Sequence, residues 1–381
     1  MAYNMDIFTK ETIEACPWPQ TQEGAYAKKF LAPIVKLGAK HFVANIETQF
    51  AVLCDGNIAL PITINYEEYD NSFVCSPFSH YVSYSSIVLN KLTNPVLKGM
   101  AGTGLRAYAA LMKRGKINRV VIVNNWLFTT NPTPDLTDNQ LDAITSFLKQ
   151  RFPTHAILFR AVTEEMCKPF VQSLRQQGFD LLASRYMNMT NGADETVFNT
   201  RIFKSDRKFV REAQFQTIDS ANISNDEIER LQKMYHALYI KKYSPLNPQF
   251  TPHFFSHIIE NQLLDIKIAK KEETLAGIAG FMHRKGQMIS PLFGYDPEIE
   301  EHKGIYRYLS TLLMLESQKY KALFNQSAGG GFFKKLRRAY GSMEYTAVYT
   351  AHLPLRRKIP WKFLKGVVNT VGAKAMKKYD E

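Results

Sequence analysis

The chain has 381 residues, which exceeds one ordinary domain and predicts two. Its 45% hydrophobic, 12% aromatic and 22% charged residues are typical of a globular protein and exclude a mostly disordered or collagen-like chain. A formal net charge of +13 favours an anionic partner. The sequence has no apolar run of about 18 residues and no signal-like start, so we expect an intracellular, cytoplasmic protein.

The four cysteines are far apart and match neither a CxxC pair nor a disulfide framework. We expect most of Cys16, Cys54, Cys75 and Cys167 to be buried thiols, and we predict no metal site. Cys75 lies near His80 in the sequence, but a nucleophilic pair also needs a third group that orients it.

The first half predicts antiparallel strands followed by alternating strands and helices. Asp55-Gly56 lies between two apolar runs in 46–66, which is a hairpin signal. Thr137 and Gln140 have capping-box spacing, and Gly178 suits a helix C-cap. The expected elements are helices at 82–91 and 105–111, strand 119–125, helix 136–151, strand 156–160, helix 168–177 and strand 179–186.

A dense polar group follows the strand at 119–125. Asn124-Asn125-Trp126 and Thr129-Thr130-Asn131 occupy the carboxyl end of this strand, where α/β folds often place ligand contacts. A substrate-facing loop and a turn built from Asn and Thr around one anchoring Trp explain these residues equally well.

The second half begins after a pattern break near Asn191-Gly192, with a boundary expected between 190 and 225. The expected elements are helices at 226–240 and 252–261, strands at 263–269, 275–283 and 287–293, a polar loop at 294–303, helix 304–319, strand 323–326, helix 329–340 and strand 344–351.

This order of elements resembles the acyl-CoA N-acyltransferase (GNAT) superfamily. The segments 294–308 and 327–334, with the pair Phe333-Lys334, are similar to its FemAB-like and cellulose-biosynthesis-type branch. The resemblance implies a mixed α/β (α+β) fold of two tandem GNAT-like domains, each a mixed twisted sheet flanked by helices. The expected domains are a degenerate copy at 1–205, a donor-binding domain at 206–352 and a basic amphipathic tail at 353–381.

The first site signal is the start of the helix at Gly304. A helix N-terminus has free N–H groups and a partial positive charge, so a phosphate can bind where glycine lets it approach. His302, Lys303 and Arg307 surround this glycine. In the superfamily this junction holds the coenzyme A pyrophosphate, but here Glu301 and Tyr306 depart from the usual Gln or Arg and Gly or Ala. FemAB-like members can use aminoacyl-tRNA instead.

The second site signal is the glycine run in Ser327-Ala328-Gly329-Gly330-Gly331. Glycines after a short strand let the main chain approach a ligand. Lys334 and the basic residues after it suit a phosphate-bearing or nucleic-acid carrier. A charged, exposed helix after a flexible turn is the alternative. We expect the two glycine-marked helix starts to converge on one cleft, and a cleft filled by packed side chains would argue against a transferase.

The resemblance also implies the chemistry, which is direct attack of an amine on a thioester. Backbone N–H groups of 287–293 would stabilise the oxyanion. The expected co-substrate is acetyl-CoA or a longer acyl-CoA, with no permanently bound cofactor. The expected donor-binding residues are Phe293, His302, Lys303, Gly304, Tyr306, Arg307, Ser327, Gly329, Gly330 and Lys334. The expected catalytic residues are Glu298, Glu300 and His283 as bases, with Asp296 and His302 as alternatives. The expected acid is Tyr340, with Tyr306 and Tyr308 as rivals.

The C-terminal 50 residues contain 12 Lys and Arg against 3 acidic residues. In 353–365, Trp361, Phe363 and leucines alternate with basic residues. Such a segment suits peripheral contact with an anionic membrane, on its inner face, or a final helix that covers the core.

The leading hypothesis is therefore an N-acyltransferase with an acyl-CoA or another acyl carrier as partner. The alternative is an aminoacyl-tRNA-dependent transferase, or a tRNA-binding protein that uses the basic C-terminal surface. The amine acceptor is not indicated by the sequence.

Overall fold

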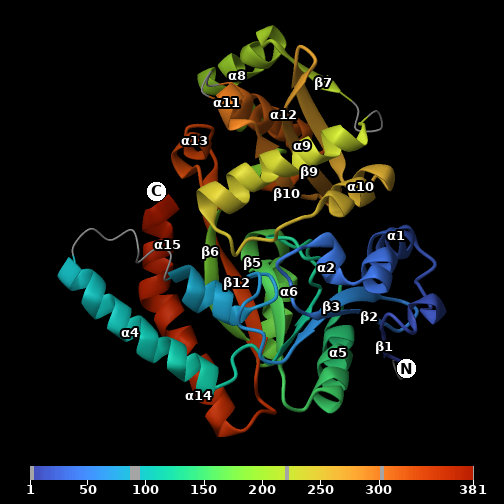
Figure 1. Ribbon diagram of the computed structural model, residues 1–381, viewed down its shortest axis with the longest axis vertical. Helices are drawn as coiled ribbons and strands as arrows, with labels where there is room; N and C mark the ends of the chain where they lie inside the picture. Colours follow the sequence, from blue (N-terminus) through green and yellow to red (C-terminus); the bar gives the residue numbers. More distant parts are fainter. Residues whose placement is uncertain (1–3, 86–94, 219–222, 301–303, 381) are drawn as a thin grey trace. The chain divides into compact units, whose positions relative to one another are not determined.

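The computed structural model describes residues 4–85, 95–218, 223–300 and 304–380 (Figure 1). The chain forms two compact units. Unit 1 consists of Met1–Ser184, Ser244–Gln249 and Glu344–Lys374, and unit 2 of Arg185–Tyr243, Phe250–Met343 and Ala375–Glu381. The expected domains 1–205, 206–352 and 353–381 do not coincide with these units, and they remain a prediction about two repeated halves.

Unit 1 contains a mixed sheet. The first five strands of the chain belong to it. They are β1 (Asp6–Phe8), β2 (Gln49–Cys54), β3 (Ala59–Asn65), β4 (Val120–Val123) and β5 (Ala156–Thr163). Strands β1 to β4 pair antiparallel in order, and β4 and β5 run parallel. The predicted hairpin is confirmed, since β2 and β3 pair from Gln49↔Ile64 to Cys54↔Ala59. Asp55 Oδ1 fixes its turn by accepting from the N–H groups of Asn57 and Ile58, both at 2.8 Å.

Two long strands belong to both units. In unit 1, residues 344–349 of β12 (Tyr340–Tyr349) pair antiparallel with β5. In unit 2, residues 189–191 of β6 (Asp180–Asn191) pair antiparallel with β11 (Leu323–Asn325). Each unit therefore takes a strand from a distant part of the sequence.

Helices cover both faces of the sheet of unit 1. They include α1 (Gln22–Leu37), α2 (Ala39–Phe42), α4 (Pro95–Arg114), α5 (Asp138–Arg151), α6 (Glu164–Gln176) and α14 (Leu355–Val367). The capping box predicted at Thr137 and Gln140 is confirmed at the start of α5. The helix predicted at 105–111 is part of α4, whereas most of the one at 82–91 lies outside the described residues. On one face, Trp361 and Leu364 of α14 join a core with Val120 and Leu158.

In unit 2 the strands follow the order β6-β11-β10-β9-β8-β7. Its further strands are β7 (Phe215–Ile218), β8 (Asp265–Lys271), β9 (Thr274–Arg284) and β10 (Gln287–Tyr295). Strands β7 to β10 form an antiparallel meander, and β11 runs parallel to β10. The helices are α7 (Glu195–Phe198), α8 (Arg201–Glu212), α9 (Asn225–His236), α10 (Pro252–Glu260), α11 (Pro297–Glu300), α12 (Ile305–Lys319), α13 (Gly331–Lys335) and α15 (Ala373–Asp380).

The order of elements predicted for the second half is confirmed. Two helices, three antiparallel strands, α12, β11, α13 and β12 follow one another along the chain. In the first half, β2, β3 and β4 are followed by α5, β5, α6 and β6, which is a comparable succession. The fold class is mixed α/β, as expected. No helix among the described residues combines the length and apolar character needed to cross a bilayer.

One helix is shorter than predicted. We expected helix 329–340, but α13 ends at Lys335. Arg338 has a φ of +61°, a left-handed conformation that no α-helix continues through. Tyr340 consequently begins strand β12 instead of ending a helix.

The buried-thiol prediction is confirmed for Cys16, Cys54 and Cys75, while Cys167 is half-buried and all four are free. Burial raises the pKa of the Cys75 thiol to about 12. The thiol therefore stays protonated at neutral pH, which argues against a nucleophilic role.

Candidate functional site

The candidate site lies in unit 2, where β10 and β11 part. The two strands pair in parallel only from Gln287↔Leu323 to Ile289↔Asn325. Strand β11 then ends, whereas β10 continues to Tyr295 and its register against β9 shifts between Ile289 and Leu292. Beyond Ile289, among the described strands, this edge of β10 has no strand partner. Residues 326–330 connect the end of β11 to α13.

The connecting segment has an unusual backbone that one lysine holds in place. Ser327, Gly329 and Gly330 have φ values of +65°, +81° and +65°. The ammonium of Lys334 donates to the carbonyl oxygens of Gln326 at 2.7 Å and Ser327 at 3.1 Å. Lys334 is only 6% exposed. Lys334, which we expected to bind the ligand, thus stabilises the conformation of the segment 326–330, hereafter the glycine loop.

The start of α12 is packed against aromatic rings. A Cβ at Gly304 would lie 3.1 Å from the ring of Phe209 and 3.2 Å from that of Phe215. The close approach that we predicted for a phosphate is therefore made by side chains of the same chain, which explains the glycine. His302 and Lys303, predicted to flank this site, lie outside the described residues.

Arg307 is held by a buried carboxylate. Its Nε lies 2.6 Å from Asp206 Oδ1, and Arg337 binds the same carboxylate through Nε at 2.7 Å and Nη2 at 3.0 Å. Asp206 is fully buried. The guanidinium of Arg307 is therefore engaged within the fold, where we had expected it to bind a donor phosphate. Sequence reasoning missed Asp206, because only the fold reveals this acid of a basic helix as the partner of two distant arginines.

The starts of α12 and α13 lie together, as expected, but aromatic rings occupy the space between them. Packed side chains therefore fill the cleft expected there, which argues against a donor site between the two helix starts and leaves the edge of β10 as the candidate. The ring of Tyr306 lies 4.9 Å from that of Phe333 and 5.6 Å from that of Phe293. Its hydroxyl would be 2.9 Å from a Cβ at Gly330. Desolvation raises the pKa of Tyr306 to about 12, so the hydroxyl stays protonated. Tyr306 narrows the junction, as expected from a tyrosine at a position that is usually Gly or Ala.

A second tyrosine hydroxyl reaches the glycine loop from a π-helical segment, η4 (Ala237–Tyr243). The Tyr243 hydroxyl would be 3.6 Å from a Cβ at Gly329, and the side chain is 42% exposed. Tyr239 stacks on Tyr235 with ring centroids 4.7 Å apart. We did not predict these residues. The spacing of four between Tyr235, Tyr239 and Tyr243 is the sequence signal that marks them as one row.

The predicted catalytic residues are dispersed. Glu298 is exposed on α11, and its N–H donates to Asp296 Oδ1 at 3.0 Å. The backbone of Glu300 ends the same short helix. Tyr340, 41% exposed, lies on β12. Tyr308 is buried and its hydroxyl lies 3.0 Å from Thr217 Oγ1, which makes it a core residue.

His283 lies at the far end of β10 from the start of α12. It pairs with Met288 and stacks on Tyr320 with ring centroids 4.5 Å apart. Gly277, which packs against α12, pairs instead with Tyr295. The six residue steps from Gly277 to His283 span roughly 20 Å. The structure therefore places His283 away from the start of α12, although its strand partner Met288 precedes Ile289, where β10 and β11 part.

Six of the expected donor-binding residues lie together around the glycine loop and the start of α12. They are Phe293, Tyr306, Ser327, Gly329, Gly330 and Lys334. Among the described residues, no cluster of His, Cys, Asp and Glu is suited to hold a metal ion.

The polar residues that follow β4 make hydrogen bonds within the fold. Asn125 Nδ2 donates to Thr63 Oγ1 at 3.0 Å and to the Val74 carbonyl at 2.8 Å. Trp126 Nε1 donates to Asn124 Oδ1 at 2.8 Å. These bonds favour the turn interpretation over a substrate-facing loop.

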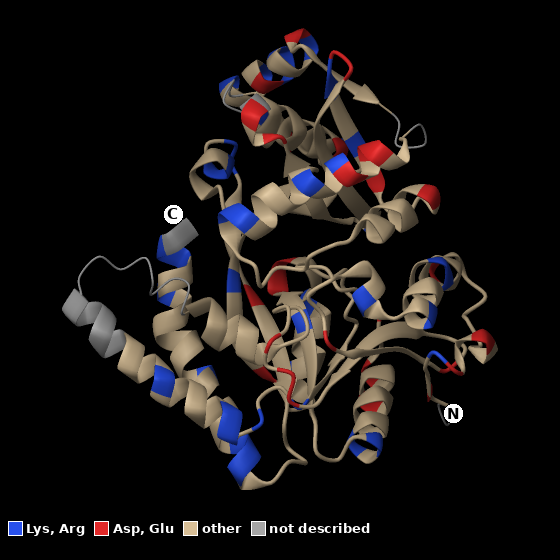
Figure 2. Cartoon of the chain, in the orientation of Figure 1, with Lys and Arg blue, Asp and Glu red and all other residues tan. Residues whose placement is uncertain are grey.

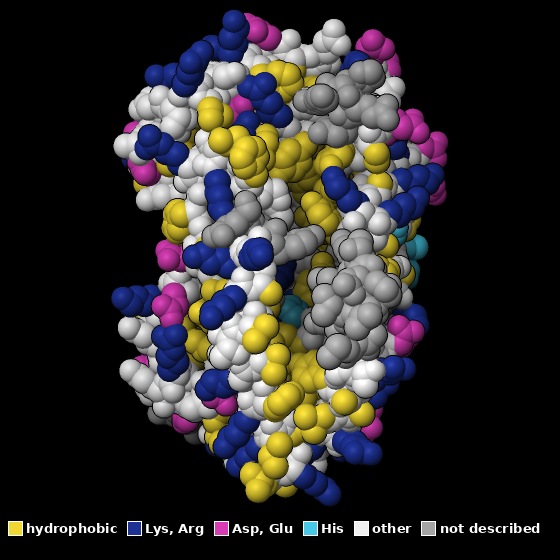
Figure 3. All heavy atoms as spheres, turned by 90° about the vertical axis from the view of Figure 1, so that its left-hand side faces the viewer, with side chains coloured by type: hydrophobic (Ala, Val, Ile, Leu, Met, Phe, Trp, Pro, Cys, Tyr) yellow, Lys and Arg dark blue, Asp and Glu magenta, His cyan; other side chains and the backbone are white. Residues whose placement is uncertain are grey.

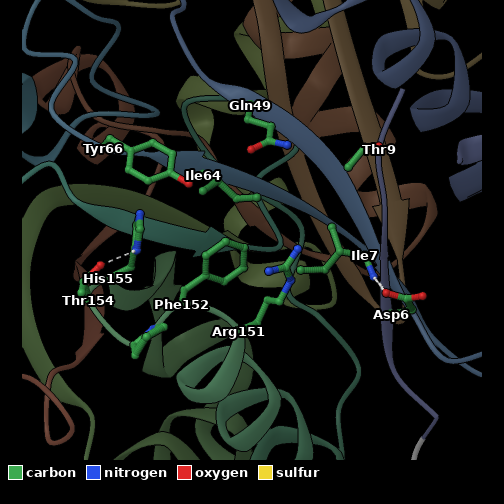
Figure 4. Close-up of a pocket in the computed structure, with 11 residues that line it drawn as sticks. Asp6, Ile7, Thr9, Gln49, Ile64, Tyr66, Arg151, Phe152, Thr154 and His155 are labelled. Atoms are coloured by element: carbon green, nitrogen blue, oxygen red, sulfur yellow. Dashed lines mark hydrogen bonds between the residues drawn. The ribbon is translucent and has the colours of Figure 1, made fainter. Parts of the chain in front are cut away.

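Unit 1 has a separate cavity of about 330 Å³, lined among others by Tyr66, Arg151 and His155 (Figure 4). His155 is 3% exposed, and burial together with nearby arginines lowers its pKa to about 4. The residue immediately precedes β5, at the amino end of the parallel strands. Ligand sites in α/β sheets usually lie at the opposite end, so this cavity is not our candidate site.

Comparison with known proteins gave no matching family model and no matching curated protein. Among solved structures, similarity was found to FemX (11% identity, 59% of this chain and 80% of that chain, TM-score 0.45). The C-terminal domain (DUF2156) of a putative lysylphosphatidylglycerol synthetase from Agrobacterium fabrum is also similar (14% identity, 76% and 96%, TM-score 0.46). So is a GCN5-related N-acetyltransferase from Kribbella flavida (10% identity, 62% and 83%, TM-score 0.33). At these values the similarities carry no conclusion about function.

Proposed function

We propose that unit 2 transfers an acyl or aminoacyl group from an activated carrier to an amine by direct attack. The observation behind this proposal is the edge of β10 that continues past β11 beside the glycine loop. An unpaired strand edge offers N–H groups to an extended ligand, as in strand addition. Such N–H groups can also stabilise the oxyanion of the tetrahedral intermediate, at roughly 3 kcal/mol per donor.

The proposed proton donor to the leaving group is Tyr243. Its side chain is 42% exposed, and its hydroxyl lies beside Gly329. The Tyr306 hydroxyl, beside Gly330, would donate a hydrogen bond to the bound donor, because its raised pKa keeps it protonated. Tyr340, the acid expected from the sequence, is the comparison residue.

The second candidate donor, aminoacyl-tRNA, is favoured over acyl-CoA by the start of α12. Phe209 and Phe215 pack against Gly304, and Asp206 engages Arg307. These contacts work against a pyrophosphate site there. Helix α8 meanwhile presents several exposed cations, as Figure 2 shows for this part of unit 2. They are Arg201, Lys204, Arg207, Lys208 and Arg211. A row of cations suits a polyanionic carrier.

A donor screen tests this function. The protein would be incubated with hydroxylamine as a general acceptor and with labelled acetyl-CoA, palmitoyl-CoA or a mixture of aminoacyl-tRNAs. We expect hydroxamate formation with one donor class. With that donor, Tyr243→Phe should lower kcat about a hundredfold, in the range of lost general acid catalysis, while Tyr340→Phe should leave kcat unchanged. Lack of transfer from every donor would refute the activity.

The comparison of the two tyrosines also tests the assignment of the acid. An equal loss in both variants, or a loss only in Tyr340→Phe, would show that Tyr243 is not the proton donor. A Tyr243→Phe variant that transfers normally would show the same.

A further inference from the structure

The outer face of α14 and of the π-helical segment after it, η5 (Val368–Gly372), is apolar where a surface helix is normally polar. Its exposed apolar side chains repeat every four residues. They are Leu355 (66% exposed), Ile359 (49%), Phe363 (47%), Val367 (38%) and Val371 (70%). This line, hereafter the apolar stripe, is about 24 Å long at 1.5 Å per helical residue.

The core does not account for the apolar stripe. Trp361, Leu364 and Val368 form the inner face of the same segment and are buried against unit 1. A surface helix needs only this one apolar face to pack. Five exposed apolar side chains outside this inner face are not needed for the core, so their presence indicates a binding surface.

Helix α4 lies beside α14 in unit 1. The ring of Tyr108 is 6.0 Å from that of Phe363, and a Cβ at Gly115, just after α4, would be 2.3 Å from the ring of Pro360. The two helices therefore form one surface. Figure 3 shows hydrophobic side chains gathered on this side of the molecule, with Lys and Arg around them.

The charged residues of the two helices themselves have one sign, and Lys365 of α14 is paired with Asp180 of β6 at 2.5 Å. The sequence contains no Asp or Glu from 71 to 134, which includes α4, and none from 353 to 378, which includes α14. Arg356 and Lys362 flank the apolar stripe and are exposed, and so are Lys113 and Arg114 at the end of α4. A second copy of the same face would meet it with like charges. An anionic surface with an apolar interior complements both features.

We propose that the apolar stripe, with the basic residues of α14 and α4, binds the anionic surface of a lipid bilayer. The helix would lie parallel to the membrane, with its apolar side chains at the boundary between headgroups and acyl chains and its cations among the headgroups. This proposal does not depend on the transferase activity, because it concerns a different surface from the β10–β11 junction.

Vesicle sedimentation of the full-length protein tests the proposal. The probes are vesicles of phosphatidylcholine alone and of phosphatidylcholine with phosphatidylglycerol in equal parts. We expect binding only to the anionic vesicles, weakening as salt shortens the Debye length from about 10 Å at 0.1 M to 3 Å at 1 M. Arg356→Glu combined with Lys362→Glu should weaken binding at least roughly 25-fold, because each lost cation costs about fivefold.

Two further variants separate apolar insertion from general charge. Leu355→Ser with Ile359→Ser should weaken binding at least tenfold, and both positions are exposed enough for the fold to tolerate serine. The matched charge control is Lys28→Glu with Lys29→Glu on α1, an exposed pair on another part of unit 1. The matched apolar control is Leu37→Ser, which is 57% exposed. Both controls should bind within about twofold of wild type, with unchanged circular dichroism.

Several outcomes would overturn the proposal. Lack of binding to anionic vesicles would do so, and so would equal binding to neutral vesicles. Controls that lose as much affinity as the α14 variants would show that total charge is what matters. A protein that dimerises through the apolar stripe and ignores vesicles would place a second copy on this face.

Discussion

At the scale of single residues, Asp206 has the greatest structural effect in unit 2. This buried carboxylate joins α8 to Arg307 of α12 and to Arg337, which follows α13. The guanidinium of Arg337 also lies over the ring of Phe333, 3.3 Å from its centroid. The shape of the candidate site therefore depends on an ion pair network that does not itself face a ligand.

Asp206→Asn should destabilise the fold by about 3–5 kcal/mol, because it leaves two arginines without their buried counter-charge. Guanidinium unfolding monitored by tryptophan fluorescence would measure the loss. Ser205→Ala is the matched control, since Ser205 is exposed and accepts a bond from Arg307 Nη2 at 3.0 Å. It should cost less than about 1 kcal/mol. Equal losses in both variants would contradict a central role for the carboxylate.

The buried His155 should make the stability of the fold sensitive to acid. Burial lowers its pKa to about 4, so the imidazole stays neutral in the folded chain after it has become protonated in the unfolded chain. The unfolded state therefore binds more protons between pH 6.5 and 4, and the free energy of unfolding falls with pH in that window. The loss from His155 approaches about 3 kcal/mol at pH 4. Urea unfolding of wild type and His155→Gln across this window should give a shallower slope for the variant, and parallel slopes would refute the assignment.

At the scale of elements, glycines in the sheet of unit 2 set how closely helices approach. A Cβ at Gly294 on β10 would lie 2.8 Å from the backbone nitrogen of Tyr235. Gly277 on β9 lies close to Leu309 and Ile305 of α12 in the same way. These glycines let α9 and α12 pack on strands that border the candidate site.

Gly294→Ala should destabilise the protein by about 1–3 kcal/mol, because the backbone of α9 must move to make room. Gly102→Ala is the opposite case, since nothing lies within 4 Å of its added Cβ in α4. Alanine there should stabilise the helix by about 0.5–1 kcal/mol. Chemical unfolding of both variants checks the pair, and a tolerated Gly294→Ala would show that α9 is loosely packed.

Local signals in the sequence predicted most elements because their causes are local. Asp55-Gly56 predicts its hairpin, and Thr137 with Gln140 predicts the start of α5. The end of α13 was missed because the residue in the left-handed conformation there is Arg338, whereas the usual sequence signal for such a turn is glycine. The same limit applies to the site, where the glycine loop and Tyr306 were predicted, whereas Asp206 and Tyr243 act through partners distant in sequence.

At the scale of the whole molecule, length and the order of elements predicted two bodies of mixed α/β structure. They did not predict that β6 and β12 would each belong to both units. Strand pairing between residues far apart in sequence leaves no local signal, so a boundary drawn along the sequence, such as the one expected between 205 and 206, does not describe strands that both units share. The tail expected at 353–381 likewise belongs largely to unit 1, since Glu344–Lys374 completes it.

Two truncations test this division. Chain 1–343 lacks the part of β12 that pairs with β5, and it lacks Trp361 and Leu364 of the core. We expect it to aggregate or to lose its near-ultraviolet circular dichroism, because Val120 and Leu158 are left uncovered. Chain 1–374 retains all of unit 1 and should keep the wild-type spectrum. A well-folded 1–343 chain would show that the last segment of unit 1 is dispensable.

The late return of the chain to unit 1 has a consequence for synthesis on the ribosome. After Ser184 has been made, about 160 residues must be translated before Glu344 appears. At about 5–20 residues per second, translation of that stretch takes roughly 8–30 s. During this time the nascent polypeptide carries an uncovered apolar face around Leu158 and Leu182, which Trp361 and Leu364 cover only after they emerge from the exit tunnel. The protein should therefore be a client of chaperones that bind nascent chains, and its yield should respond to translation speed.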